Sequence, residues 1–144
     1  MTVNAVPYLT FDGKAREAME FYHGIFGGEL NVATYGEFGT PEDDPAHGWV
    51  MHAAITGGAI TLAASDYDPR MTEDNAAYVV GNHLSISLWG DDIDEGTTYF
   101  NALSEGGTVG MPFETQIWGD TYGQLTDKFN IEWSVNVGAA AQPA

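Results

Sequence analysis

Histidine is the residue type with which this chain could do acid–base chemistry, since an imidazole can act as a base or as a hydrogen-bond donor. Four histidines occur and cysteine is absent, so thiol nucleophiles, cysteine-type zinc sites and disulfides are excluded. His52 lies in a predicted strand, in register with Val50 and Ala54. It is a candidate for a base or donor that lines a cleft, and its structural alternative is a histidine at a sheet edge.

Residues 83–89 alternate between polar and apolar side chains, which predicts a half-buried strand that opens at His83. His83 and Ser85 share its polar face with Ser87 and Trp89. His83 is either a ligand-contacting residue or a polar strand residue bonded to backbone or water. We favour the second interpretation.

Aromatic residues suggest the walls of a ligand pocket. Trp118 and Tyr122 lie in the glycine-rich run WGDTYG, where a ring can face a cavity. Tyr8 is expected to face the same cleft from a different strand. The alternative for such rings is core packing, which we favour for four others: Phe21, Phe100, Phe129 and Trp133.

Acidic pairs are a further candidate for acid–base work. Asp43-Asp44 and Asp91-Asp92 are better explained by loop solvation and helix capping. Asp12 is likewise expected to cap a helix over residues 14–25, and Asp91 or Asp92 to cap a second helix.

A repeat organises the elements that must position these residues. Five identities recur at one constant offset of 79 positions, without a gap: Leu9/Leu88, Asp12/Asp91, Phe21/Phe100, Gly27/Gly106 and Gly28/Gly107. They mark a strand end, a helix start, a buried aromatic and a double-glycine stop. The pattern predicts two copies of one supersecondary unit.

Each copy is predicted to be a βαβββ module, which gives an α+β fold with two sheets curved around a common cleft and helices outside. We place both modules in a single domain. Module one covers about residues 1–65, a crossover 66–82 and module two 83–137, and 138–144 form a tail. Residues 108–113 are expected to form a short strand that breaks at Pro112.

The formal net charge is −17, and Lys14, Arg16, Arg70 and Lys128 are the fixed cations. Such a chain is repelled by nucleic acids and anionic membranes. A secretory signal and an apolar run of about 18 residues are both missing from the sequence, so we expect a cytoplasmic protein.

Two stretches resemble a known family. The run PYLTFDGKAREAMEFY at residues 7–22 followed by FGGE at 26–29, and the later WGD, YG, LTDKF and Trp133, resemble the PhnB-like subgroup of the vicinal oxygen chelate superfamily. That superfamily includes glyoxalase I, bleomycin-resistance proteins and extradiol dioxygenases. The resemblance implies the paired-module fold, a small-molecule ligand and a homodimer.

The resemblance also implies a divalent metal held by the first, fourth, fifth and eighth strands. Carried over, it makes His83 and Glu132 candidate ligands, with Ser134 as the alternative to Glu132. Asn4 takes the first-strand place, and the fourth strand offers Thr61 or Ala63, so at most two good ligands remain.

Two functions stay open at this point. One is a metal-free binding or sequestering protein, towards which we lean. The other is a divalent-metal-dependent lyase, isomerase or dioxygenase acting on a small oxygenated substrate. Some members of the subgroup carry a methyltransferase label, but this sequence has no glycine-rich loop between a strand and a helix to cradle the usual cofactor.

Overall fold

The computed structural model describes residues 3–138, and these divide into two compact units on either side of a boundary between Val79 and Val80. Most of the predicted tail lies outside the described residues. No helix in the described part of the chain has the length and apolar character to cross a membrane.

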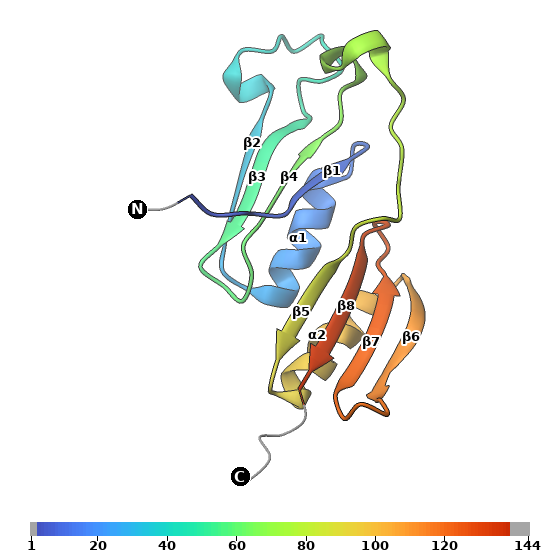
Figure 1. Ribbon diagram of the computed structural model, residues 1–144. Coiled ribbons are helices and arrows are strands. Elements are labelled where there is room, and N and C mark those ends of the chain that lie inside the picture. Colours follow the sequence, from blue (N-terminus) through green and yellow to red (C-terminus); the bar gives the residue numbers. More distant parts are fainter. Residues whose placement is uncertain (1–2, 139–144) are drawn as a thin grey trace. The chain divides into compact units, whose positions relative to one another are not determined.

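The first unit is a four-stranded sheet with a helix against one face (Figure 1). The strand order is β1-β4-β3-β2, with β1 parallel to β4 and the other pairs antiparallel. Its elements are β1 (Tyr8–Phe11), α1 (Ala15–Phe26), β2 (Glu29–Thr34), β3 (Val50–Thr56) and β4 (Leu62–Asp66), with 3-10 turns at Gly36–Phe38, Pro69–Met71 and Glu73–Asn75.

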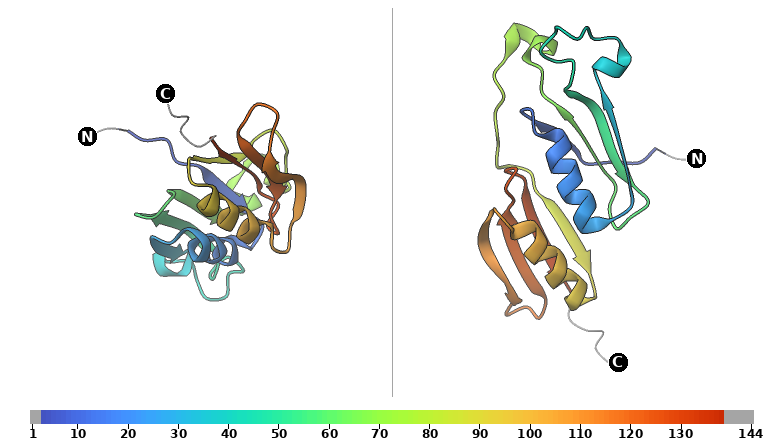
Figure 2. Two further views of the ribbon diagram at one scale, coloured as in Figure 1. Left: turned by 90° about the horizontal axis from the view of Figure 1, so that it is seen from below. Right: turned by 180° about the vertical axis from the view of Figure 1, so that it is seen from behind.

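The second unit repeats this plan with the order β5-β8-β7-β6, and α2 covers one face of its sheet (Figure 2). Again the first strand is parallel to the fourth, and the remaining pairs are antiparallel. Its elements are β5 (Ile86–Gly90), α2 (Ile93–Ser104), β6 (Thr108–Thr115), β7 (Thr121–Thr126) and β8 (Glu132–Val137). The predicted α+β fold of two βαβββ modules is confirmed.

Helix α1 forms because apolar residues recur at helical spacing along one side. Its buried residues are Ala15, Ala18, Met19, Tyr22 and Phe26. A fully buried side chain the size of Met or Phe stabilises the fold by about 1.5–3 kcal/mol. In the second unit Phe100 and Trp133 are buried, as predicted, whereas Phe21 and Phe129 are only half-buried.

The cap predicted for α1 is wrong. The helix begins at Ala15, Lys14 occupies the N-cap position, and no side chain there caps it. Instead the Ala15 N–H donates to Oδ1 of the buried Asp66 at 2.9 Å, and the Val50 N–H donates to Oδ2 at 2.8 Å. Asp66 can do this because parallel pairing sets it beside Phe11, where the chain turns into the helix.

The cap predicted for α2 is confirmed at one of its two candidate residues. The side chain of Asp92 accepts from the N–H groups of Asp94 and Glu95, at 3.0 and 3.1 Å. These are two of the four helix-start donors that the helix itself cannot satisfy.

Two predicted strand boundaries are also wrong. The strand expected to open at His83 begins at Ile86, the first residue paired with β8, so His83 and Ser85 precede it. The strand expected to break at Pro112 continues to Thr115. It tolerates proline because β6 is an edge strand, and its register shifts on both sides of Met111.

Candidate functional site

The second sheet has a polar face on the side that α2 leaves open. Successive strand residues point to opposite faces, and the buried set on β7 and β8 includes Gly123, Leu125, Trp133 and Val135. The other set faces the open side, and its members lie in register across three strands. Ser87 of β5 pairs with Ser134 of β8. On β7, Tyr122 pairs with Asn136, Gln124 with Ser134 and Thr126 with Glu132. The Ser134 hydroxyl donates to Ser87 Oγ at 2.8 Å.

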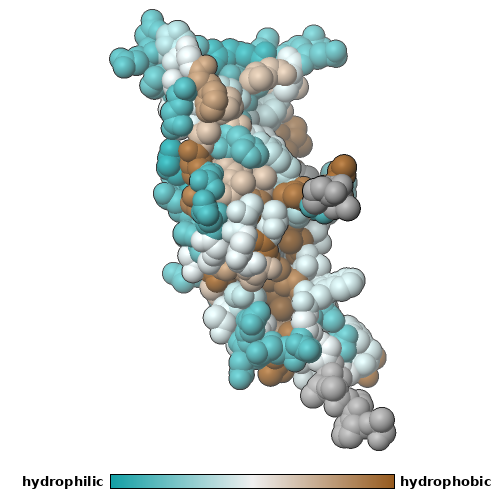
Figure 3. Space-filling view, turned by 90° about the vertical axis from the view of Figure 1, so that its left-hand side faces the viewer, coloured by the Kyte–Doolittle hydropathy of each residue, from teal (hydrophilic) through white to brown (hydrophobic). Residues whose placement is uncertain are grey.

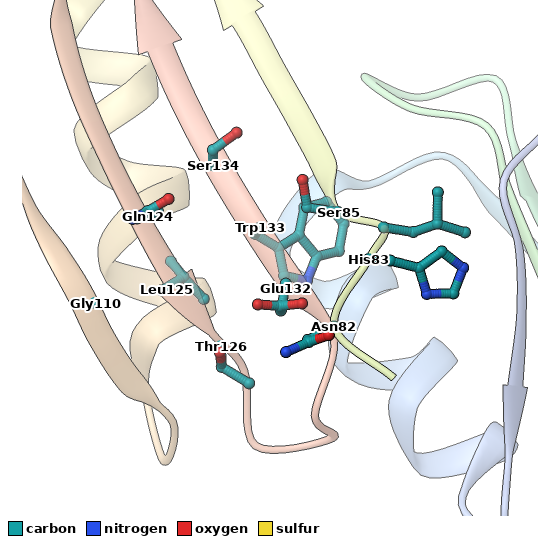
Figure 4. A pocket seen from close by; sticks show the side chains of 11 residues that line it. Asn82, His83, Ser85, Gly110, Gln124, Leu125, Thr126, Glu132, Trp133 and Ser134 are labelled. Carbon is teal, nitrogen blue, oxygen red and sulfur yellow. The ribbon is translucent and has the colours of Figure 1, made fainter. Parts of the chain in front are cut away.

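A cavity of about 330 Å³ opens at one end of this face, where β8 begins and the chain approaches β5 (Figure 4). Its size is at the lower end of the range for small-molecule pockets. Leu84, Leu125 and Trp133 supply apolar lining, and polar groups come from Asn82, His83, Ser85, Gln124, Thr126, Glu132 and Ser134.

Four residues singled out from the sequence line this one cavity: His83, Ser85, Glu132 and Ser134, the alternative to Glu132. The lining also includes Asn82, Gln124 and Thr126, which sequence reasoning missed. A signal for two of these was available, because Gln124 and Thr126 alternate with buried residues along β7.

Trp118 and Tyr122 contact each other but are not among the residues that line this cavity. Their ring centroids are 6.3 Å apart, and Trp118 in the turn before β7 is 58% exposed. The Tyr122 hydroxyl donates to Oε1 of Gln124 at 3.3 Å. Tyr122 is therefore linked to the cavity through Gln124, and the two rings form a separate apolar spot on the same unit.

Tyr8 and His52 meet on the first sheet. The Tyr8 hydroxyl lies 3.2 Å from Nδ1 of His52, and the rings stack at 5.8 Å with an interplanar angle of 27°. Tyr8 lies beside Ala63, which lies beside Ala54, so two small side chains leave the space in which the rings meet.

His52 itself departs from the predicted register. A register shift opposite Ala33 and Thr34 separates it from Val50, which is 1% exposed whereas His52 is exposed. An exposed imidazole beside a phenol can bind a polar group or exchange a proton with one.

Arg70 connects the acidic loop after β2 to the chain that follows β4. Its guanidinium donates to both carboxylate oxygens of Asp68, at 2.9 to 3.2 Å, and of Asp44, at 3.1 and 3.3 Å. It also lies 5.9 Å from the centroid of the Trp49 ring. Hydrogen bonds from Arg70 are the largest cause that lowers the pKa of each carboxyl below its ordinary value.

We expect the Arg70 contacts to weaken in acid. A carboxyl with a lowered folded-state pKa contributes stability above its usual pKa, and that stability is lost as the pH falls through the folded-state value. The Arg70→Met variant should raise the pKa of Asp44 and Asp68. It should also speed amide exchange in residues 36–48 at pH 6, whereas the wild type should show this faster exchange only when the pH falls below the ordinary carboxyl pKa.

Carboxyl NMR titration and hydrogen exchange measure these two effects. Arg16→Met, which removes an exposed cation on α1, is the matched control and should change neither. Unchanged carboxyl pKa values in Arg70→Met would contradict the assignment.

The family resemblance implies a divalent metal, which would need several donor side chains in one place. His83 and Glu132 line one cavity, but the described residues contain no group of three or more histidine and carboxylate side chains placed to hold a metal ion. Catalytic zinc sites use three protein ligands. The described residues therefore do not fit that metal site, and no catalytic step is assigned to a metal.

Comparisons with known proteins agree with this fold. Residues 6–135 match the family model described as the Glyoxalase/Bleomycin resistance protein/Dioxygenase superfamily. Protein YjdN of Escherichia coli (strain K12) is 27% identical over 139 residues, which cover 91% of this chain and 92% of YjdN.

Two of the similar solved structures illustrate the likeness. The crystal structure of protein PA1353 from Pseudomonas aeruginosa superposes with a TM-score of 0.80 and 37% identity, covering 96% of this chain and 99% of that one. A PhnB protein from Bacillus cereus gives a TM-score of 0.71 at 24% identity, covering 94% of this chain and 100% of that one, and it shows the same fold.

Proposed function

Because the chain belongs to the glyoxalase/bleomycin resistance protein/dioxygenase superfamily, we propose that it binds a small molecule in the cavity on the open face of the second sheet. The observation that carries this proposal is the convergence of seven polar residues from three separate segments on one cavity of about 330 Å³. Pockets for small molecules combine an apolar wall with a few polar groups that fix the orientation of the guest.

The alternative is a divalent-metal-dependent lyase, isomerase or dioxygenase. It is favoured by the presence of His83 and Glu132 at the same cavity. A pair of donors holds a metal ion poorly, so we prefer the binding function. Equilibrium dialysis against Ni²⁺ and Zn²⁺ separates the two, since one tightly bound ion per chain, lost in His83→Ala, would favour the metal enzyme.

Benzyl alcohol is a suitable probe for the proposed binding, because it is neutral, small enough for the cavity and polar at one end. We expect dissociation constants of about 1 mM, which is typical for so few atoms. In ¹H–¹⁵N spectra of the full chain, shifts should concentrate at the amides of Ser85, Gln124 and Ser134.

A cavity-filling variant makes this test specific. Ser85→Trp should abolish the shifts, whereas Asn101→Trp, on exposed α2 surface behind the sheet, should leave them unchanged. Shifts that persist in Ser85→Trp, or the absence of shifts in the wild type, would contradict the proposal.

A further inference from the structure

We propose that this cavity selects a cation: a protonated amine carried on a small apolar body. This inference rests on the proposed function and names the chemical class of its ligand. It follows from the state of one carboxylate, the location of the fixed cations and the nature of the other lining groups.

Glu132 is the carboxylate that lines the cavity, and it is half-buried at the start of β8 (Figure 4). Within residues 3–138 its side chain has no hydrogen bond or ion pair. A carboxylate partly removed from water gains most from a partner that is both charged and a hydrogen-bond donor. A protonated amine supplies both properties in one group.

The fixed cations that would attract an anionic ligand lie elsewhere. Arg70 is bound to Asp44 and Asp68, and Lys14 lies 3.6 Å from Glu17. Lys128 lies over the ring of Phe129 at 5.6 Å, and Arg16 is on α1. None of the four is among the residues that line the cavity. A carboxylate or phosphate ligand would therefore meet Glu132 without a compensating lysine or arginine.

The other lining groups suit an ammonium head and an apolar tail. Side-chain oxygens of Asn82, Ser85 and Thr126 can accept hydrogen bonds from the remaining N–H groups. Leu84, which is 78% exposed, offers apolar contact. Figure 3 shows exposed hydrophobic residues interspersed with hydrophilic ones on one face of the molecule.

The negative charge of the whole chain also favours cationic ligands, and it acts at long range. A formal net charge of −17 raises the local concentration of cations and repels anions. This effect is general to the surface and is screened by salt, whereas the contact with Glu132 is local. The two contributions can be separated by removing the same charge at two different places.

Three probes of nearly equal size differ mainly in charge: benzylamine, benzyl alcohol and benzoate. In ¹H–¹⁵N titrations of the full chain at pH 8, we expect benzylamine to bind at least tenfold more tightly than benzyl alcohol. Benzoate should produce no shifts at the cavity. In Glu132→Gln, the affinity for benzylamine should fall to that for benzyl alcohol, which should itself change less than twofold.

Glu114→Gln is the matched control, because it removes the same formal charge from an exposed residue of β6 that does not line the cavity. It should change the affinity for benzylamine less than twofold. Equal losses in the two variants, or benzoate binding as tight as that of benzylamine, would overturn the selection of a cation. Cavity binding of benzyl alcohol with no preference for benzylamine would overturn this inference alone, and the absence of all binding would overturn the proposed function as well.

Discussion

Gly107→Ala is expected to lower the free energy of unfolding by about 3 kcal/mol. A Cβ at this position would meet the backbone oxygen of Thr126, and it would lie 2.9 Å from Cα and 3.0 Å from the carbonyl carbon of Asp127. These are all backbone atoms, so no side-chain rotation can relieve the overlap. The turn after β7 would have to move away from the start of β6.

Gly28 is the equivalent residue of the first unit, and its substitution by alanine should lower the free energy of unfolding by at least as much. A Cβ at Gly28 would lie 2.6 Å from the backbone oxygen of Thr56 and 2.8 Å from the nitrogen of Gly58. Gly28 also has a φ of +88°, which adds about 1–2 kcal/mol of backbone strain for any residue with a Cβ. We therefore expect Gly28→Ala to cost about 4 kcal/mol.

Urea unfolding followed by circular dichroism measures both losses. Gly90→Ala is the matched control, because a Cβ at Gly90 would meet nothing within 4 Å and its φ is not positive. It should change the free energy of unfolding by less than about 0.5 kcal/mol. If Gly107→Ala and Gly28→Ala also changed the free energy of unfolding by no more than this control, the close backbone contacts at the two glycines would not be needed for stability.

These glycines also show which structural roles could be predicted from the repeat in the sequence and which could not. The double glycine was predicted as a helix stop, and Gly27 does end α1 with a φ of +71°. The second glycine of each pair is needed for a different reason, because the backbone of a later hairpin packs directly against it. That hairpin lies more than 15 residues further along the chain. No local pattern contains that information, because the contact exists only once the sheet is assembled.

The paired aspartates of the repeat were given a role that other residues fill. Asp12 and Asp91 recur at the same offset and were expected to mark helix starts, but neither contributes the side chain that caps a helix. Asp66 does so for α1 and Asp92 for α2. Asp66 reaches the helix from β4 through parallel pairing with β1, a tertiary relation that capping rules based on neighbouring residues do not contain.

The candidate site was predictable to the extent that it follows strand periodicity. His83 and Ser85, which the alternation of residues 83–89 put on one polar face, line the same cavity as Glu132, but so does Leu84, which the alternation put on the opposite face. The strand boundary was wrong because pairing with β8 begins only at Ile86. Which residues of β7 lie opposite Glu132 depends on the register of the β7–β8 hairpin, and that register is set by the turn between them.

That turn depends on Asp127, whose side chain is 2% exposed. Its Oδ1 accepts from the N–H groups of Phe129 and Ile131, at 2.8 and 3.0 Å. Its Oδ2 accepts from the indole N–H of Trp133 at 2.8 Å. One buried carboxylate therefore fixes the turn after β7 and orients the ring that packs beneath the cavity.

Asp127→Ala is expected to cost about 3–5 kcal/mol, because it removes three charge-assisted hydrogen bonds and leaves a buried indole N–H without its acceptor. Asp127→Asn keeps the size but places an N–H₂ group against one of the donors, so we expect a loss of about 2 kcal/mol. Asp91→Ala, at an exposed residue, is the control and should be near neutral.

The indole N–H resonance of Trp133 distinguishes a local role from a general loss of stability. In Asp127→Asn at low temperature, where the fold persists, this resonance should shift and exchange faster with solvent. Glu132 precedes Trp133 directly, so a disturbed turn should also move the carboxylate and weaken benzylamine binding. If Asp127→Asn had wild-type stability and an unshifted indole resonance, Asp127 would not hold the hairpin. The register of β7 and β8 at the cavity would then have to be set by other contacts.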